Sequence, residues 1–223
     1  MKIARLIFNP IQENTYVIWD DTLEAAIIDS GNMGERENAA LEKFVADNGL
    51  KPVLAINTHG HFDHLWGVDF LREKWGVKFA MSGKDEFLLK SGSVSAELFG
   101  IRADALPETI DIDMDGMEEI SFGSTTLKII PTPGHTPGHV SLYEPAMKVL
   151  FTGDTLFRES IGRTDLPGGD YSWIMRSIIE NILPLGDDVK IYPGHGEASD
   201  IGHESMYNPF VVEVINNEVN YKN

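Results

Sequence analysis

The first fifty residues alternate between short apolar runs and polar breaks. Apolar side chains recur at strand spacing over residues 3–8, 14–19 and 25–29, which predicts three strands. Over residues 34–48 the apolar side chains fall on one helical face, and Gly49 follows as a helix stop signal. This part of the chain therefore predicts three strands followed by a helix that covers them.

The next apolar run, residues 53–56, predicts a buried strand because all four of its side chains are apolar. Apolar positions from Leu65 to Trp75 then recur at helical spacing, and Gly76 marks the end of that helix. The run 58–64, with the sequence THGHFDH, lies between the two elements. It is predicted to sit at a strand end that opens into a helix.

The second half of the chain repeats the order of strands followed by a helix. Strands are predicted near residues 118–130, 139–143 and 148–152. A helix is predicted from Asp170, a typical N-cap residue, to Leu183, because Pro184 cannot continue it. No repeat and no low-complexity linker divides the chain, so residues 1–223 are predicted to form a single domain.

Composition limits the possible classes of protein. The chain has 223 residues and 42% hydrophobic residues, with no apolar run near the ~20 residues that a membrane span needs, which predicts a soluble protein without a membrane partner. Its beginning, MKIARLIFNP, predicts a strand entering a turn instead of a secretory signal, which favours the cytoplasm. The net charge of -17 would repel a phosphate backbone, so no nucleic-acid partner is expected.

The run 58–64 concentrates four side chains that can bind a metal ion. His59 and His61 are two residues apart and point to the same side of an extended backbone, whereas Asp63 and His64 lie where the chain turns and can face a second ion. Imidazole nitrogen and carboxylate oxygen are ligands that Zn, Mn and Fe accept. Because the chain has no cysteine, any such site uses nitrogen and oxygen ligands alone.

Three further residues of this kind each follow a predicted strand. They are His135, Asp154 and His195, which come after the apolar runs 127–130, 149–152 and 189–192. Strand ends that share one edge of a sheet converge, so residues far apart in sequence can complete one cluster. Each of the three could instead be a turn residue, and their joint occurrence is what indicates a metal site.

The order of these residues resembles the metallo-β-lactamase superfamily over most of the chain. The superfamily pattern is an Asp after an early strand, then HxHxDH, a His, an Asp and a final His. This sequence has Asp29, the run 58–64, His135, Asp154 and His195 in that order. The resemblance implies an α/β fold, an αββα sandwich of two mixed β-sheets flanked by helices.

The resemblance also implies a role for each ligand. One metal would be held by His59, His61 and His135, the other by Asp63, His64 and His195, and Asp154 would bridge them. The implied cofactors are two divalent metal ions, Zn in the first place, with Fe or Mn as alternatives. Asp29 would accept a hydrogen bond from a ligating imidazole and fix its tautomer, or be a turn residue.

Two segments narrow the resemblance to one branch. Residues 157–171 and 201–210 resemble the glyoxalase II group, or hydroxyacylglutathione hydrolases, in its short bacterial form. This implies hydrolysis of a small-molecule thioester by a hydroxide shared between two metals, with Asp63 and Asp154 as catalytic carboxylates. The glutathione-gripping helical domain of full-length members is not expected in residues 196–223, and residues 82–107 could form a flap over the site or structural cover.

Other functions of the superfamily remain open. Persulfide dioxygenases share a GRTD loop with this chain and use one iron, which His59, His135 and Asp154 would hold here. A non-catalytic metal-binding protein is disfavoured by the complete ligand set. Antibiotic hydrolysis is disfavoured because secreted β-lactamases commonly carry a signal peptide, and one large group of them uses a cysteine ligand.

Four polar residues near the expected ligands have weaker assignments. His139 is either a partner of a metal ligand or a packed histidine, and the latter is the commoner case. His203 is interpreted as structural. Arg163 and Asp165 are expected to form an ion pair that shapes the loop after Asp154, although Arg163 could instead bind a substrate carboxylate. The sequence contains no indication of the oligomeric state.

Overall fold

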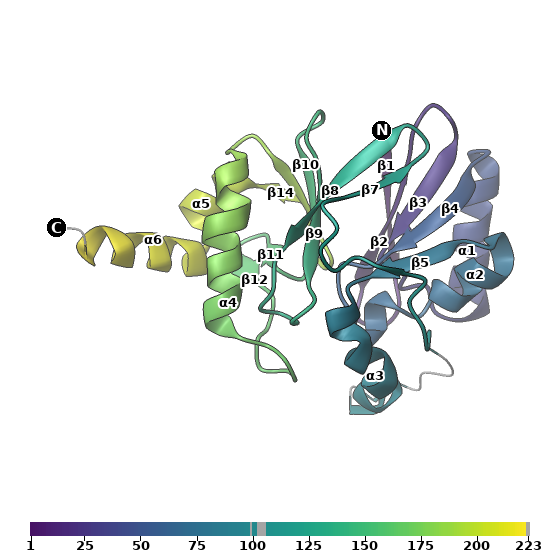
Figure 1. Cartoon of the computed structure of the whole chain (residues 1–223), viewed down its shortest axis with the longest axis horizontal. Helices are drawn as coiled ribbons and strands as arrows, with labels where there is room; N and C mark the ends of the chain where they lie inside the picture. The colour runs from purple at the N-terminus through teal and green to yellow at the C-terminus, as the bar shows by residue number, and fades with distance from the viewer. Residues whose placement is uncertain (99, 102–105, 222–223) are drawn as a thin grey trace. The chain divides into compact units, whose positions relative to one another are not determined.

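The computed structural model describes residues 1–98, 100–101 and 106–221, without the side chains at positions 94, 98 and 217–221. The chain splits into two compact units, Met1–Leu127 and Lys128–Asn223 (Figure 1). Within the described ranges, no helix is long and apolar enough to cross a membrane. The single domain predicted from the sequence stays a prediction.

The first unit is built on a six-stranded mixed sheet in the order β1-β2-β3-β4-β5-β6. Its strands are β1 (Lys2–Phe8), β2 (Glu13–Trp19), β3 (Glu24–Ile28), β4 (Lys51–Ile56), β5 (Lys78–Met81) and β6 (Ile112–Asp113). β2 is antiparallel to both β1 and β3, and β3 to β6 are parallel. The C-terminal ends of β1, β3, β4 and β5 therefore lie at the same edge of the sheet.

Helices α1 (Gly34–Asp47) and α2 (Val68–Trp75) pack on one face of this sheet. Leu41 and Val45 of α1 and Leu71 of α2 are buried in one apolar cluster with side chains of β2, β3, β4 and β5. Gly76 ends α2 with a left-handed φ of 67°, as its sequence position predicts. The unit also contains two single turns of 3₁₀ helix, η1 (Phe62–His64) and η2 (Gly83–Asp85), helix α3 (Glu86–Leu98) and strand β7 (Glu119–Phe122).

The second unit is built on a mixed sheet in the order β14-β13-β10-β9-β8-β7, and the boundary between the units falls within β8. Its further strands are β8 (Thr125–Pro131), β9 (Val140–Glu144), β10 (Val149–Gly153), β13 (Lys190–Pro193) and β14 (Ser199–Asp200), and β11 (Leu156–Phe157) pairs with β12 (Ser160–Ile161). β9 is antiparallel to β8 and β10, and β10 is parallel to β13. The C-terminal ends of β8, β10 and β13 therefore share one edge.

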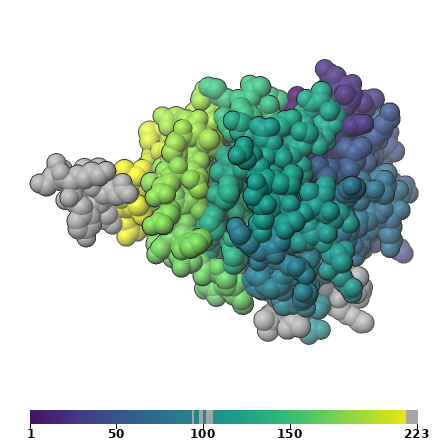
Figure 2. All heavy atoms as spheres, viewed as in Figure 1, coloured from purple at the N-terminus to yellow at the C-terminus, as the bar shows by residue number. Residues whose placement is uncertain are grey.

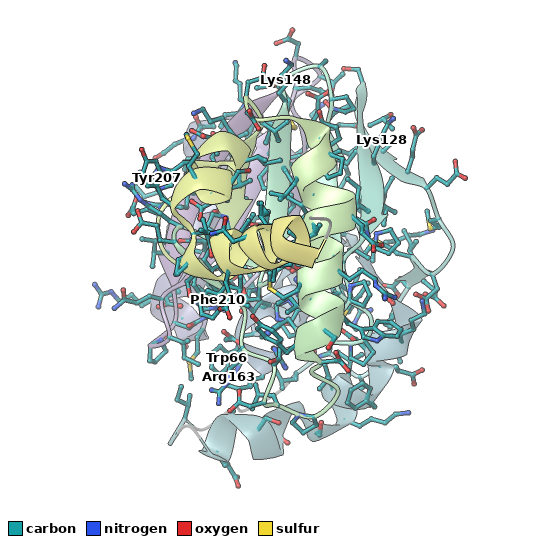
Figure 3. The ribbon with its side chains drawn as sticks, turned by 90° about the vertical axis from the view of Figure 1, so that its left-hand side faces the viewer. Trp66, Lys128, Lys148, Arg163, Tyr207 and Phe210 are labelled. Atoms are coloured by element: carbon teal, nitrogen blue, oxygen red, sulfur yellow. The ribbon has the colours of Figure 1, made fainter. Side chains whose placement is uncertain are left out.

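The helices of the second unit close an apolar core on its sheet. They are α4 (Tyr171–Arg176), which continues through a π-helical turn η3 (Ser177–Ile182) and a 3₁₀ turn η4 (Leu183–Leu185), then α5 (Ile201–Tyr207) and α6 (Pro209–Tyr221). Ile174, Ile201 and Val211 are fully buried in this core, and Phe210 packs against it (Figure 3). α4 forms part of the surface of the unit (Figure 2), and its Trp173 is 57% exposed.

Most predicted elements are confirmed, and three predictions are wrong in detail. The strand predicted over residues 118–130 is a hairpin of β7 and β8, because Gly123 adopts a left-handed φ of 52° between them. Pro184 does not stop the helix before it, since it lies inside the 3₁₀ turn η4, whereas Asp170 caps α4 as predicted by accepting from Trp173 N at 2.9 Å. Val53 is 37% exposed, so β4 is not buried throughout.

A buried carboxylate joins two turns of the first unit. Asp20, after β2, accepts hydrogen bonds from Thr22 N at 2.9 Å and from Ser124 N at 2.7 Å, and Thr125 Oγ1 donates to it at 3.0 Å. Burial acts to raise the pKa of Asp20, but the hydrogen bonds from Thr22 and Ser124 outweigh it and hold the pKa well below its usual range. The ionised form of Asp20 is therefore the one that stabilises the fold.

We expect Asp20→Ala to lower the free energy of unfolding by about 1–3 kcal/mol at pH 7, because the donors of Thr22, Ser124 and the buried Thr125 lose a charged acceptor. Since the folded pKa is depressed, this stabilisation is present above the unfolded carboxyl pKa of ~3.9 and is lost as the pH falls below it. Urea unfolding of the metal-free protein at pH 7 and near pH 3 measures both effects. The exposed neighbour Asp21→Ala is the control, and an equal loss in both variants would contradict the assignment.

Candidate metal centre

The strand order of the first unit brings polar residues to one edge of its sheet. Asp29 directly follows β3, and Asn57 and the run 58–64, here called the metal loop, follow the neighbouring parallel strand β4. Asp29 N donates to Ile56 O at 2.9 Å, which fastens the two strand ends to each other. Loops at the carboxyl ends of adjacent parallel strands are a common place for binding sites.

The four ligand-type side chains of the metal loop lie together, as the sequence predicts. The ring centroids of His59 and His61 are 4.8 Å apart, and those of His59 and His64 are 4.3 Å apart. Asp63 and His64 lie in the 3₁₀ turn η1, where the chain leaves the extended conformation. His59 and His64 are fully buried and Asp63 is 7% exposed, so this group of imidazoles and a carboxylate is largely removed from bulk water.

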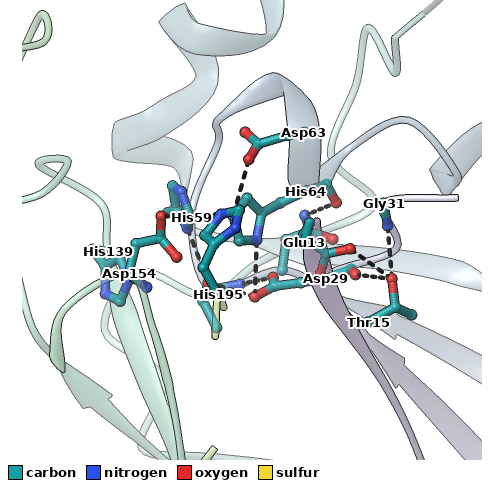
Figure 4. Close-up of polar contacts among 12 residues, drawn as sticks. Glu13, Thr15, Asp29, Gly31, His59, Asp63, His64, His139, Asp154 and His195 are labelled. Carbon is teal, nitrogen blue, oxygen red and sulfur yellow. Dashed lines mark hydrogen bonds and ion pairs between the residues drawn. The ribbon is translucent and has the colours of Figure 1, made fainter. Parts of the chain in front are cut away.

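The carboxylate of Asp29 supports two of these histidines, and its contact with His64 is drawn in Figure 4. Its Oδ2 lies 3.3 Å from His64 Nδ1, which favours a proton on that nitrogen, and it accepts from Thr58 Oγ1 at 2.8 Å. Because the Thr58 hydroxyl gives its proton to Asp29, it must accept from His59 Nδ1, 3.0 Å away. Both rings then present Nε2 as the nitrogen that can bind a metal. Asp29 thus contacts His64 directly and acts on His59 through the hydroxyl of Thr58.

The distance between Asp63 and His64 is informative. Asp63 Oδ2 lies 3.6 Å from His64 Nε2, which is too long for a hydrogen bond. Two ligand atoms bound to one tetrahedral zinc ion at ~2.0–2.2 Å are roughly 3.3–3.6 Å apart. The pair therefore has the separation expected of two ligands of a shared ion.

The second unit brings its three predicted ligands to one edge of its own sheet. His135, Asp154 and His195 follow β8, β10 and β13, whose C-terminal ends lie at the same edge of the sheet. Asp154 Oδ2 lies 3.5 Å from His135 Nε2 and 3.6 Å from His195 Nε2. Both distances match two ligands of one ion, so a single carboxylate has the ligand spacing to an imidazole on either side.

The loop after β12 fixes the tautomer of His135. His135 Nδ1 lies 2.7 Å from Arg163 O, and because a carbonyl only accepts, Nδ1 carries the proton and Nε2 is left as the ligand atom. Arg163 donates to both carboxylate oxygens of Asp165, at 2.7 and 2.8 Å, and this interaction lowers the pKa of Asp165 to about 2. The predicted ion pair is confirmed, and it shapes the turn that carries the Arg163 carbonyl.

His139 and His203 both have structural contacts. His139 is buried, and its Nε2 accepts from Asp154 N at 3.0 Å while Nδ1 lies 2.8 Å from Thr132 Oγ1. It is thus a packed histidine that also holds the backbone of a predicted ligand. His203 Nε2 lies 3.0 Å from Glu159 Oε1 beside α5.

Glu13 is a buried acid that the sequence reasoning missed. Burial is the largest influence on it and raises the pKa of its carboxyl well above the usual range; the charge of His64 acts in the opposite direction and that of Asp29 adds to the rise. Thr15 Oγ1, which lies 2.8 Å from Glu13 Oε2, also contacts the carbonyl of Asp29 and the amide of Gly31 (Figure 4). This hydroxyl links β2 to the loop that carries Asp29.

Sequence reasoning also missed Asn9, Asn57 and Asp85, which contact the backbone of the metal loop. Asn9 and Asn57 directly follow β1 and β4, and a search for amide side chains at ends of parallel strands would have found them. The predicted flap, residues 82–107, begins with η2 and α3, and α3 contacts η1. Residues 99 and 102–105 of that segment lie outside the described residues.

We expect Asp29→Asn to weaken metal binding about 10–100-fold, because an amide nitrogen in place of Oδ2 cannot accept from Thr58 or favour a proton on His64 Nδ1. Asparagine also tolerates the left-handed φ of 51° at this position. Thr58→Val removes the hydroxyl between Asp29 and His59 but leaves the contact of Asp29 with His64, and should have a smaller effect. Metal titration against a competing chelator measures both, and wild-type affinity in Asp29→Asn would contradict the role of Asp29.

Comparison with known proteins gives a consistent family. The profile described as Metallo-beta-lactamase superfamily matches residues 8–203. The hydroxyacylglutathione hydrolase GloC of Haemophilus influenzae is 40% identical over 213 residues, which cover 95% of this chain and 98% of that protein.

Two solved structures support the same family. The BLEG-1 B3 metallo-beta-lactamase has a TM-score of 0.87 and 35% identity, covering 94% of this chain and 99% of that one. TTHA1623 in a di-iron-bound form has a TM-score of 0.83 and 32% identity, covering 93% and 99%. The predicted fold class, two mixed β-sheets with flanking helices in the metallo-β-lactamase fold, is confirmed.

Histidine and aspartate clusters of the described residues fit, in the kind of donor that they offer, a dinuclear metal site of this superfamily. Their histidines are held in the tautomers that expose a ligand nitrogen, as in His59 and His135. The profile spans most of the sequence, and the similarity to a named hydrolase covers nearly the full length of both chains. The chain therefore belongs to the metallo-β-lactamase superfamily of metal-dependent hydrolases.

Proposed function

We propose that this protein is a metal-dependent thioester hydrolase of the glyoxalase II type. The observation that carries the proposal is the position of Asp154, whose Oδ2 has ligand spacing to both His135 and His195. A carboxylate with an imidazole ligand on each side is suited to bridge two ions, and two-ion sites are typical of hydrolases.

The proposed ligands are divided between two divalent ions. His59, His61 and His135 would hold one, Asp63, His64 and His195 the other, with Asp154 as the bridge. This division rests on the resemblance to the superfamily and on the spacing of the Asp63–His64, His135–Asp154 and His195–Asp154 pairs. Zinc is proposed in the first place, and iron is an alternative because TTHA1623 is described in a di-iron-bound form.

Two bound divalent ions would supply a water of lowered pKa for attack on a carbonyl and electrostatic stabilisation of the charge that develops there. The protein itself fixes the tautomers and orientations of the ligand side chains. Asp29 and Thr58 keep the proton of His59 on Nδ1, and the Arg163 carbonyl does so for His135. His139 Nε2 accepts from the backbone amide of Asp154, which orients the carboxylate that would bridge the ions. No side chain is required to act as nucleophile.

The substrate class is proposed from the relatives. The relative GloC is named a hydroxyacylglutathione hydrolase, and a thioester of glutathione is the substrate that name implies. A small-molecule substrate also agrees with the net charge of -17, which would repel nucleic acid. A cytoplasmic location is part of this proposal.

The direct test is hydrolysis of S-D-lactoylglutathione by the metal-free protein before and after zinc is restored. We expect no activity without metal and saturable hydrolysis with it. A chromogenic β-lactam is the comparison substrate, because BLEG-1 is described as a β-lactamase. Hydrolysis of the β-lactam with none of the thioester would overturn the proposal.

The alternative, a persulfide dioxygenase with one iron, differs in its use of His195. It needs His59, His135 and Asp154 alone, whereas the two-ion hydrolase also needs His195. We expect His195→Ala to lower kcat/KM about a hundredfold or more and to reduce the metal content by about one ion per chain, because one ion loses a ligand of three. Unchanged metal content in His195→Ala, together with oxygen uptake on a persulfide in place of thioester hydrolysis, would favour the one-iron alternative.

A further inference from the structure

Side chains from outside the metal loop hold its backbone at separate points. Asp85 Oδ2 accepts from Gly60 N at 3.0 Å, between His59 and His61. At the other end, Asn9 Nδ2 donates to the carbonyl of Asp63 at 2.9 Å. All of these contacts lie within the first unit.

Asn9 is held rigidly in place. Its Nδ2 also donates to Gly31 O at 3.1 Å, and its Oδ1 accepts from Ile11 N at 3.0 Å, so both protons and the oxygen of the amide have partners. A Cβ on Gly31 would lie 2.5 Å from Asp63 O and 2.8 Å from Asn9 Nδ2, which shows how closely these backbones approach. The amide of Asn9 therefore fixes the position of the Asp63 peptide, next to a predicted ligand.

Asp85 holds the other half of the loop from a different element. It is fully buried at the end of η2, directly before α3. A Cβ on Gly60 would lie 3.0 Å from the Asp85 Cβ and 3.1 Å from the Leu88 Cβ, so the loop backbone packs directly on the start of α3. Gly60, which joins His59 to His61, is thereby fixed by a hydrogen bond and by close packing.

We propose that Asp85 and Asn9 are positioning residues that set the affinities of the two ions separately. Asp85 acts on the ion held through His59 and His61, and Asn9 on the ion held through Asp63 and His64. The inference rests on the proposed function, since it requires two bound ions. Partners that orient metal ligands commonly change metal affinity 10–100-fold when they are removed.

The experiment is a zinc titration of the metal-free full chain against a chromophoric chelator, which resolves two binding steps. His61→Ala and Asp63→Ala serve as references, because each should remove the step of its own ion. Far-UV circular dichroism and thermal unfolding of every metal-free variant show whether it is folded. The readout is affinity for each ion and does not depend on catalytic activity.

Asn9→Gly is expected to lower the zinc affinity of one binding step, the step that Asp63→Ala removes, by at least about tenfold. The affinity of the other step should stay within about threefold of the wild type. Glycine is chosen because residue 9 has a left-handed φ of 52°. Asp85→Ala is expected to give the reverse pattern. Asn9→Asp and Gly60→Ala are second variants of the two halves, with the same expected patterns.

Matched controls separate these effects from general damage. Gln12→Gly lies in the same turn as Asn9, has a left-handed φ of 61° and is exposed. Glu86→Gln lies beside Asp85, and its side chain pairs with Lys90 at the surface. Both controls are expected to bind zinc as the wild type does.

Three outcomes decide between the proposals. Opposite selectivity of the Asn9 and Asp85 variants supports separate anchors. The inference is overturned if either folded variant weakens both binding steps equally or weakens neither. In that case the proposed function still stands, provided that the wild type binds zinc in two steps. A wild type that binds fewer than two ions overturns both.

Discussion

His59→Ala is expected to lower kcat/KM for thioester hydrolysis by at least about a thousandfold, or ~4 kcal/mol of transition-state stabilisation. His59 is fully buried and its Nδ1 is occupied by Thr58, so its Nε2 is the atom offered to a metal. Without it, one ion would keep two of its three histidines and the bridging carboxylate. Steady-state kinetics with S-D-lactoylglutathione and metal analysis of the same samples measure the loss.

His203→Ala is the matched control for this prediction. His203 lies beside Glu159 at the edge of α5, and its side chain is 28% exposed. Its replacement should leave kcat/KM within about twofold, as is usual for surface substitutions away from a site. Unchanged metal content and substantial activity in a well-folded His59→Ala variant would contradict the ligand assignment.

Asp154→Ala is expected to lower the total metal content below that of Asp63→Ala. Under the proposed division, Asp154 would serve both ions as a bridging carboxylate and Asp63 would serve one, so Asp154→Ala should lose most of both ions and nearly all activity. Elemental analysis after dialysis at one fixed zinc concentration compares the two variants. Both residues are 7% exposed, so they differ little in the cost of removing a buried carboxylate.

Two results of this comparison would contradict the proposed bridge. Equal metal losses in the two variants would indicate that Asp154 binds a single ion. A larger loss in Asp63→Ala would show that the spacing of Asp154 to His135 and His195 does not reflect a bridge. Either result would count against the two-ion account.

The candidate ligands could be predicted from the sequence because each one follows a strand with a clear apolar pattern. Parallel strand ends meet at one edge, so His135, Asp154 and His195 could be grouped from their positions in the chain alone. The compact run 58–64 predicted its own cluster through its density of imidazoles and carboxylate. Candidate ligands that are defined by residue type and by strand order can thus be predicted from a sequence.

The supporting contacts could not be predicted, because they depend on backbone conformation and long-range packing. Asn9 reaches the Asp63 carbonyl only because residue 9 adopts a left-handed turn, and 54 positions separate the two residues in the chain. Glu13 carries no pattern that distinguishes a buried acid from an exposed strand residue. The π-helical turn η3 after α4 likewise has no simple signal in the helical spacing of Ile174 to Ile182.

Short strands and turns also could not be predicted from the sequence. β11 and β12 have two residues each, too few for an alternating pattern, yet they lead into the turn that places the Arg163 carbonyl at His135. The hairpin of β7 and β8 was merged into one predicted strand because Gly123 alone marks its turn. The loops that complete a site of this kind are therefore known only from the structure and could not be predicted from the sequence.

The most direct test of the central claim is the metal content of the active protein, measured with its reaction. Purified protein reconstituted separately with zinc and with ferrous iron should bind about two ions per chain and hydrolyse S-D-lactoylglutathione without consuming oxygen. One iron per chain, oxygen uptake on glutathione persulfide and no thioester hydrolysis would contradict the account.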